Sequence, residues 1–133
     1  MQKIEKNKEA IRKFFDYFLN QNYDEMLTLF TDDVTHSMPG KFPFAGQMNG
    51  LEEYITRIKN RFQGNVIEAK FDILHLTAED NRVSAEAVGL FKFKNGIVYE
   101  NTYHFLYLFN DEGMICRMIE YMDTYNFTKL FSK

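Results

Sequence analysis

The hydrophobic positions change their period once along the chain, near residue 66, and divide it into a helical part and a strand part. Before this point, segments 4–20 and 50–64 carry apolar side chains three and four positions apart, which is typical of amphipathic helices. A short third helix is expected after Asn22. Beyond residue 66, apolar and polar side chains alternate with a period of two, which predicts strands in the segments 66–77, 82–94, 97–109 and 114–123.

Short turns join the predicted strands. Asn95-Gly96 is a strong hairpin signal, because both positions of a type I′ turn need a positive φ, and the polar stretch 110–113 marks a second turn. Strands joined in this way are antiparallel neighbours. A short strand at 34–37 and a closing helical turn at 125–131 complete the order, which predicts an α+β architecture with helices on one face of a curved sheet. No linker or repeat interrupts it, so residues 1–133 are expected to form a single domain.

The composition supports a packed interior with apolar material to spare. Of the 133 residues, 45% are hydrophobic and 17% aromatic, with 14 Phe, 8 Tyr and no Trp. The surplus could line a cavity or cover a subunit interface. The net charge is −3 and no run of basic residues occurs, which argues against nucleic acid or an anionic membrane as a partner.

The compartment can be inferred from three features. The single Cys116 cannot form an internal disulfide, which fits a reducing environment. The first ten residues are polar and lack the apolar core of a signal peptide. The longest apolar run, "FLYLF", is too short to span a bilayer. We therefore expect a cytoplasmic protein without a membrane segment.

Two carboxylates near the C-terminus raise the question of a pocket. Glu120 and Asp123 are three residues apart on the last predicted strand, so they point to opposite faces and at most one can line a cavity. Asp123 ends the strand just before the closing helical turn, and we expect its carboxylate to cap that helix. The spacing alone does not say whether Glu120 faces a pocket.

The order of the elements, the stretch "LFTDDVTHSMPGKFPFAGQMNGLEEY" and the terminal "DEGMICRMIEYMDTYNF" together resemble the SnoaL-like branch of the nuclear transport factor 2-like superfamily. The resemblance covers essentially the whole chain. It implies a cone-shaped, curved, mostly antiparallel sheet with three helices packed on its concave face, around a deep apolar pocket. It also implies a homodimer joined through the outer face of the sheet. Members include ketosteroid isomerase, limonene epoxide hydrolase, scytalone dehydratase and polyketide cyclases, so the fold alone does not determine the reaction.

Two members of the family can be compared residue by residue. The general base, the oxyanion tyrosine and the protonated aspartate of ketosteroid isomerase fall at Ser37, at Phe14 and at or beside Phe105. The final-strand aspartate of limonene epoxide hydrolase matches Glu120, but its arginine and second aspartate fall at Glu86 and Val88. Each mechanism therefore lacks essential groups, and neither is expected here.

The same comparison orients the strands. It places Glu120 and Glu86 toward the pocket, as the candidate catalytic residues. The other candidate pocket residues share an inward position in the comparison: Phe15, Phe18, Thr35, Ser37, Tyr54, Ile58, Val88, Asn101, Tyr103, Phe105, Met118 and Met122. The small residues Ala85, Ala87 and Gly89 then fall on the outer face, where they would let a second sheet approach closely.

Two carboxyl groups in one apolar cavity could act as a general acid and a general base. Desolvation and mutual repulsion disfavour two charges, so one group would keep its proton, and such a pair can supply an acid and a base. The leading hypothesis is a cofactor-independent isomerase, cyclase, dehydratase or hydrolase acting on a small hydrophobic compound. In this hypothesis, the bound compound is oriented by the polar side chains of Asn101, Tyr103, Ser37 and Thr35. The three histidines are scattered, so no metal site is expected.

Other interpretations stay open. Either glutamate could lie at the rim in water or in a structural network, since charged residues on strands are mostly solvated or paired. The protein could also be a non-catalytic homodimeric module that binds a hydrophobic ligand or a partner protein. A cavity filled by Phe and Tyr side chains would instead favour a structural role.

Overall fold

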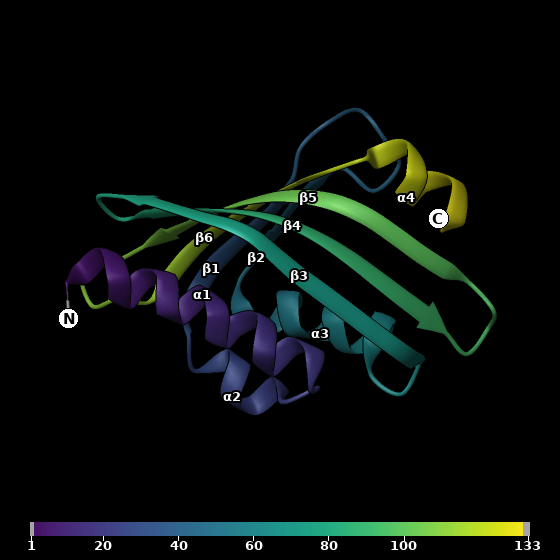
Figure 1. Ribbon diagram of the computed structural model, residues 1–133, viewed down its shortest axis with the longest axis horizontal. Helices are drawn as coiled ribbons and strands as arrows, with labels where there is room; N and C mark the ends of the chain where they lie inside the picture. Colours follow the sequence, from purple (N-terminus) through teal and green to yellow (C-terminus); the bar gives the residue numbers. More distant parts are fainter. Residues whose placement is uncertain (1, 132–133) are drawn as a thin grey trace.

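A curved six-stranded sheet with helices on one face forms the body of the protein (Figure 1). The structure is a computed structural model that describes residues 2–131. Its helices are α1 (Lys3–Leu19), α2 (Tyr23–Leu27), α3 (Leu51–Phe62) and α4 (Thr124–Leu130). Its strands are β1 (Phe30–Met38), β2 (Gly46–Asn49), β3 (Val66–Glu79), β4 (Arg82–Phe93), β5 (Val98–Phe109) and β6 (Ile115–Met122).

The strands follow the order β2-β1-β6-β5-β4-β3 across the sheet. Neighbouring strands are antiparallel except for β1 and β6, which run parallel. The prediction of an α+β fold with a mostly antiparallel sheet is therefore confirmed. The parallel pair matters most for function, because it places the first long strand of the chain beside the last one.

Helices α1, α2 and α3 lie under the concave face of the sheet, and α4 lies at one end of it (Figure 1). The three helices on the concave face agree with the prediction, and the expected closing turn is the helix α4. Asp123 caps this helix as expected, because its side chain accepts a hydrogen bond of 3.1 Å from the backbone N–H of Asn126.

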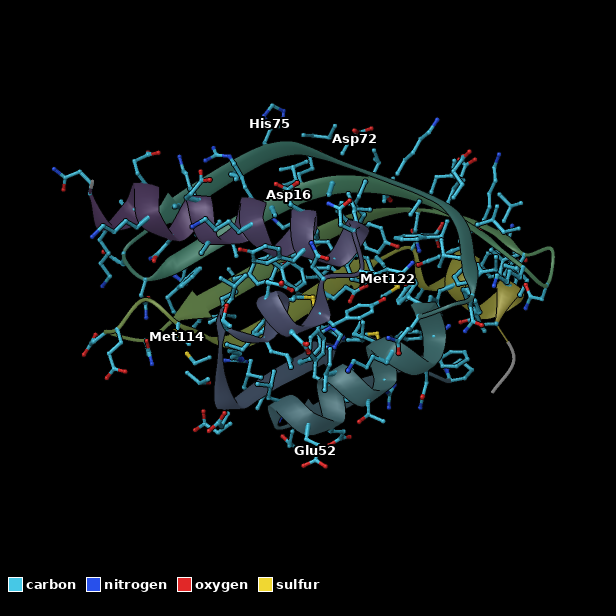
Figure 2. All side chains as sticks on the ribbon, turned by 90° about the horizontal axis from the view of Figure 1, so that it is seen from below. Asp16, Glu52, Asp72, His75, Met114 and Met122 are labelled. Carbon is cyan, nitrogen blue, oxygen red and sulfur yellow. The ribbon has the colours of Figure 1, made fainter. Side chains whose placement is uncertain are left out.

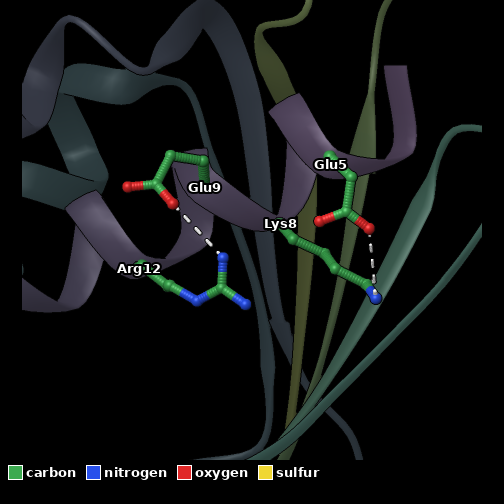
Figure 3. Close-up of polar contacts among 4 residues, drawn as sticks. All are labelled: Glu5, Lys8, Glu9 and Arg12. Carbon is green, nitrogen blue, oxygen red and sulfur yellow. Dashed lines mark hydrogen bonds and ion pairs between the residues drawn. The ribbon is translucent and has the colours of Figure 1, made fainter. Parts of the chain in front are cut away.

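Helix α1 has one face in the core and one in solvent. Its apolar stripe, which includes Ile11, Phe14 and Phe15, is buried against the sheet. Its outer face carries two ion pairs at i,i+3 spacing, Glu5 with Lys8 at 3.8 Å and Glu9 with Arg12 at 3.2 Å (Figure 3). Such exposed pairs contribute little to stability, so packing of the apolar stripe holds the helix in place.

The core between helices and sheet consists largely of stacked and edge-on aromatic rings. Phe71 of β3 is an example: its ring stacks on Phe15 with centroids 4.6 Å apart and lies 5.5 Å from Tyr103. The small residues of β4 face this core. Ala85 and Ala87 are buried, and the inward face continues through Gly89.

The predicted facing of the small stripe on β4 is therefore wrong. A Cβ at Gly89 would lie only 2.9 Å from the Phe71 ring, so the glycine makes room for that ring. The stripe consequently gives no support to a second sheet packing on the outer face, and the homodimer stays a prediction.

Candidate active site

An aromatic cavity of about 80 Å³ lies between the helices and the sheet. Residues from α1, α3 and four strands form its wall: Phe14, Phe15, Phe18, Tyr54, Ile58, Phe62, Phe71, Phe91, Tyr103, Phe105 and Glu120. Among the residues that the structure describes, Glu120 supplies the only charged group of this wall. The cavity thus brings one carboxylate against a surface of rings.

Glu120 is held by His36. The imidazole Nε2 and the carboxylate Oε1 are 2.9 Å apart, and the two side chains are 9% and 18% exposed. Because an ionised carboxylate can only accept, Nε2 donates this hydrogen bond. The ring of Tyr54 packs edge-on against the imidazole, with centroids 5.2 Å apart. Within residues 2–131 no other group hydrogen-bonds to the carboxylate, so its second oxygen can serve a bound molecule.

The parallel pairing of β1 and β6 creates this contact. His36 lies beside Met118 in the register, two residues before Glu120, so both side chains reach the same face of the sheet. The imidazole Nδ1 is buried and has no hydrogen-bond partner among residues 2–131. One side of the ring therefore meets the carboxylate, while the other keeps an unused polar atom.

The tyrosines around the cavity stay protonated at neutral pH. Burial raises the pKa of Tyr54 far above its ordinary value, and the charge of Glu120 acts in the same direction. Burial likewise raises the pKa of Tyr103 and of Tyr107. These phenols can orient a ligand but cannot act as bases, so the carboxylate–imidazole pair is the group suited to proton transfer.

Asn101 faces inward but lies outside the cavity wall. Its side-chain amide donates to the Tyr99 hydroxyl at 2.7 Å and to the backbone carbonyl of Asp123 at 3.1 Å. Its carbonyl accepts the backbone N–H of Asp123 at 3.2 Å. Burial raises the pKa of Tyr99 to about 12. Asn101 thus ties the end of β6 to β5, rather than serving the cavity.

Several predicted pocket residues do line the cavity: Phe15, Phe18, Tyr54, Ile58, Tyr103, Phe105 and Glu120. Met118 and Met122 belong to or pack against the core next to it, and Figure 2 shows Met122 among the interior side chains. A binding or catalytic role for all of these residues stays a prediction.

The structure does not bring Glu86 and Val88 to the cavity. Glu86 is exposed on the outer face of β4, where its neighbours in the register are His75 and His104. Figure 2 shows His75 pointing away from the body of the protein. The predicted pairing of two glutamates in one cavity is therefore wrong. The prediction placed β4 one residue out of phase, and such an offset turns every side chain of a strand to the other face. Both faces of β4 carry apolar residues, so the pattern of apolar residues does not identify the inward face.

Thr35 and Ser37 also lie on the opposite face of their strand from the one predicted. The Ser37 hydroxyl donates to the Gln47 side chain at 3.0 Å on the exposed side. His36 between them is buried and reaches Glu120. The missed signal is in the sequence, because Val34, His36 and Met38 alternate as one mostly apolar face.

Residues 2–131 contain no group of three or more His, Cys, Asp or Glu side chains that could hold a metal ion. None of the helices in the same range is long and apolar enough to cross a bilayer.

Solved structures share this fold over nearly their whole length. Bal32a, from a soil-derived mobile gene cassette, superimposes with a TM-score of 0.84 at 20% identity, over 97% of this chain and 98% of its own. An NTF2-like protein from Burkholderia xenovorans LB400 gives 0.76 at 16% identity, over 96% of each chain. An LEH-like epoxide hydrolase from M. tuberculosis superimposes with a TM-score of 0.77 at 18% identity, over 97% of this chain and 92% of its own. These likenesses define the class as the NTF2-like fold.

The sequence match narrows the class. The family model of the SnoaL-like domain matches residues 11–118, so the chain belongs to the SnoaL-like domain family. No curated protein matched the sequence.

Proposed function

We propose that this protein is an enzyme that moves a proton to or from a small, mostly apolar compound, with Glu120 as the proton-transfer group. The observation that carries the proposal is the Glu120 carboxylate in the wall of an aromatic cavity, 2.9 Å from His36 Nε2. A carboxylate is a common general base, and it must lie within hydrogen-bond reach of the proton it takes.

His36 acts as the positioning residue in this scheme. Its N–H holds one carboxylate oxygen, which leaves the other oxygen to accept a proton from the bound compound. The ring packing of Tyr54 on the imidazole limits the rotation of this pair. The Glu120 side chain is only 18% exposed, and its low exposure to water strengthens the electrostatic interaction between carboxylate and substrate.

The size of the cavity limits the compound. Pockets that bind drug-sized ligands measure roughly 300–1,000 Å³, whereas this cavity measures about 80 Å³. It therefore suits a compound of a few non-hydrogen atoms, or one end of a larger compound. The M. tuberculosis protein of the same fold is an LEH-like epoxide hydrolase, which supports hydrolysis as an outcome of the proton transfer, by a mechanism other than the limonene epoxide hydrolase one.

The second candidate function is a non-catalytic module that binds a hydrophobic ligand, as a homodimer. The observation in its favour is the nearly all-aromatic wall, together with the position of Glu86 outside the cavity. This alternative predicts ligand binding without turnover, and affinity that does not depend on the Glu120 carboxylate.

Hydrogen–deuterium exchange of a small ketone separates the two candidates without knowledge of the natural substrate. Acetone in D₂O exchanges its α-hydrogens when a base removes them, and NMR follows the exchange. We expect the protein to accelerate this exchange and Glu120→Gln to lower the rate by about 10²–10⁴-fold.

The matched control is Glu86→Gln, because that carboxylate is exposed on the outer face and its loss should leave the rate unchanged. Thermal unfolding of each variant verifies that the fold is intact. If the wild type does not accelerate exchange, or if Glu120→Gln exchanges at the wild-type rate, the proposal fails and the binding module is favoured.

A further inference from the structure

A second hollow, a groove of about 1050 Å³, lies beside the aromatic cavity. One side of it is the face of α3 that carries Arg57 and Arg61, and the other side is the turn between β4 and β5 with Lys94. Phe93 and Phe131 supply aromatic surface at the same end. The groove thus combines three cationic side chains with rings.

The three cations are not neutralised within the described chain. Among residues 2–131, no carboxylate oxygen lies within 4.0 Å of the charged nitrogens of Arg57, Arg61 or Lys94. Arg57 and Arg61 are one helical turn apart and therefore lie on one face of α3. Such a set of donors can bind an anionic group, and arginine forks fit carboxylate, sulfonate or phosphate oxygens well.

Arg61 also packs over two aromatic rings near the C-terminus. Its guanidinium carbon lies 5.1 Å from the ring centroid of Phe127 and 4.6 Å from that of Phe131. Cation–π contacts of this kind fix the plane of the guanidinium. Burial lowers the pKa of Arg61; the neighbouring Tyr99 opposes this shift and the charge of Arg57 adds to it.

Two glutamates also line the groove: Glu53 is one helical turn from Arg57, and both glutamates are at the opposite end of α3 from Arg61. Glu52 and Glu53 are in the first turn of α3, and Arg61 is in the last. Arg61 is eight residues after Glu53, which corresponds to about 12 Å along the helix axis. Figure 2 shows Glu52 pointing away from the body of the protein. An anion at the Arg61 end therefore meets the cations before the glutamates.

A single layer of rings separates the groove from the cavity. Phe62 follows Arg61 in the chain and lines the cavity. Its ring lies 5.2 Å from Phe91, which also lines the cavity, and 5.9 Å from Phe93, which lines the groove. A compound bound in the groove can thus place its apolar part against the layer that bounds the cavity.

We infer that the groove binds the anionic group of an apolar organic acid through Arg57, Arg61 and Lys94, with the apolar part of the acid on the Phe62–Phe93 layer. The groove and the aromatic cavity are separate sites on the two sides of this layer, so the inference does not depend on the proposed function.

Two fluorescent probes test the inference. Anilinonaphthalene sulfonate is an apolar anion, and phenylnaphthylamine is the same molecule without the sulfonate. We expect the protein to bind the sulfonate about 10–100-fold more tightly, the range given by one or two charge-assisted hydrogen bonds. Added NaCl should weaken binding of the sulfonate and leave binding of the neutral probe unchanged.

The variants locate the site. Arg57 and Lys94 are exposed, so the double variant Arg57→Gln/Lys94→Gln keeps the fold and should lose at least about tenfold in sulfonate affinity. Arg61→Gln should lose sulfonate affinity by a similar factor, and thermal unfolding of this variant verifies that the fold is intact. The control is Lys59→Gln, which removes the same charge from the same helix outside the groove and should change nothing.

Equal affinity for the two probes, or an equal loss in Lys59→Gln and in the double variant, would overturn the inference. The two proposals fail separately. Loss of the sulfonate preference removes the groove site and leaves the exchange of neutral acetone as evidence for Glu120. Wild-type exchange by Glu120→Gln removes the proposed chemistry and leaves the probe titrations as evidence for the groove.

Discussion

Replacing Gly89 by alanine tests which face of β4 meets the core. A Cβ at this position would lie 2.9 and 3.1 Å from two ring carbons of Phe71 and 3.3 Å from a ring carbon of Phe91. Favourable carbon contacts lie near 3.5–4.0 Å, so the methyl group overlaps the Phe71 ring. That ring is stacked on Phe15 at 4.6 Å and cannot move in that direction without disturbing a second ring.

The expected cost follows from two opposing effects. Overpacking a core typically costs about 1–3 kcal/mol. Alanine also reduces the conformational entropy of the unfolded chain, which stabilises the fold by about 0.4–1 kcal/mol where the backbone accepts it, and Gly89 does not have a left-handed φ. We therefore expect Gly89→Ala to lower the free energy of unfolding by about 1–2 kcal/mol.

Urea unfolding followed by circular dichroism measures this change. Ser84→Ala, on the outer face of the same strand, is the control and should stay within about 0.5 kcal/mol of the wild type. In a double-mutant cycle, Phe71→Leu should recover part of the loss, because it removes the ring that the methyl group meets. If Gly89→Ala is as stable as the wild type or more stable, the inward facing of β4 and the packing argument are refuted.

Two further predictions concern the C-terminal cap and the buried tyrosines. Asp123→Ala removes the cap on Asn126 and should cost about 1 kcal/mol in urea unfolding, whereas Asp123→Asn should retain most of it; equal losses would contradict a capping role. Because burial raises the pKa of Tyr99 from 10.0 to about 12, the folded state keeps a proton that the unfolded chain releases in this range. Its contribution to stability is therefore fully present below pH 10 and falls as pH rises, by about 2 kcal/mol at pH 12. The same alkaline slope in Tyr99→Phe would contradict this assignment.

The elements themselves were predictable because their signals are local. The helical stripe of α1, the alternation of β3 to β6 and the Asn95-Gly96 turn all depend on residues close together in the chain. Asp123 was assigned as a cap for the same reason. Strand β2 was missed, since its four residues are too short to show a period, and its extended form depends on pairing with β1.

The sequence by itself determined that Glu120 and Asp123 point to opposite faces, because alternation along one strand is a local property. It did not determine which face of β4 meets the core, whereas the alternation of Val34, His36 and Met38 does indicate the inward face of β1. Both faces of β4 carry apolar residues, and the register between β1 and β6 shifts between Phe30 and Thr35. Only the tertiary structure decided the facing of β4, through the fit of aromatic rings against Gly89. It also joined His36 to Glu120, which are 84 residues apart in the chain, because the parallel pairing of β1 with β6 has no local signature.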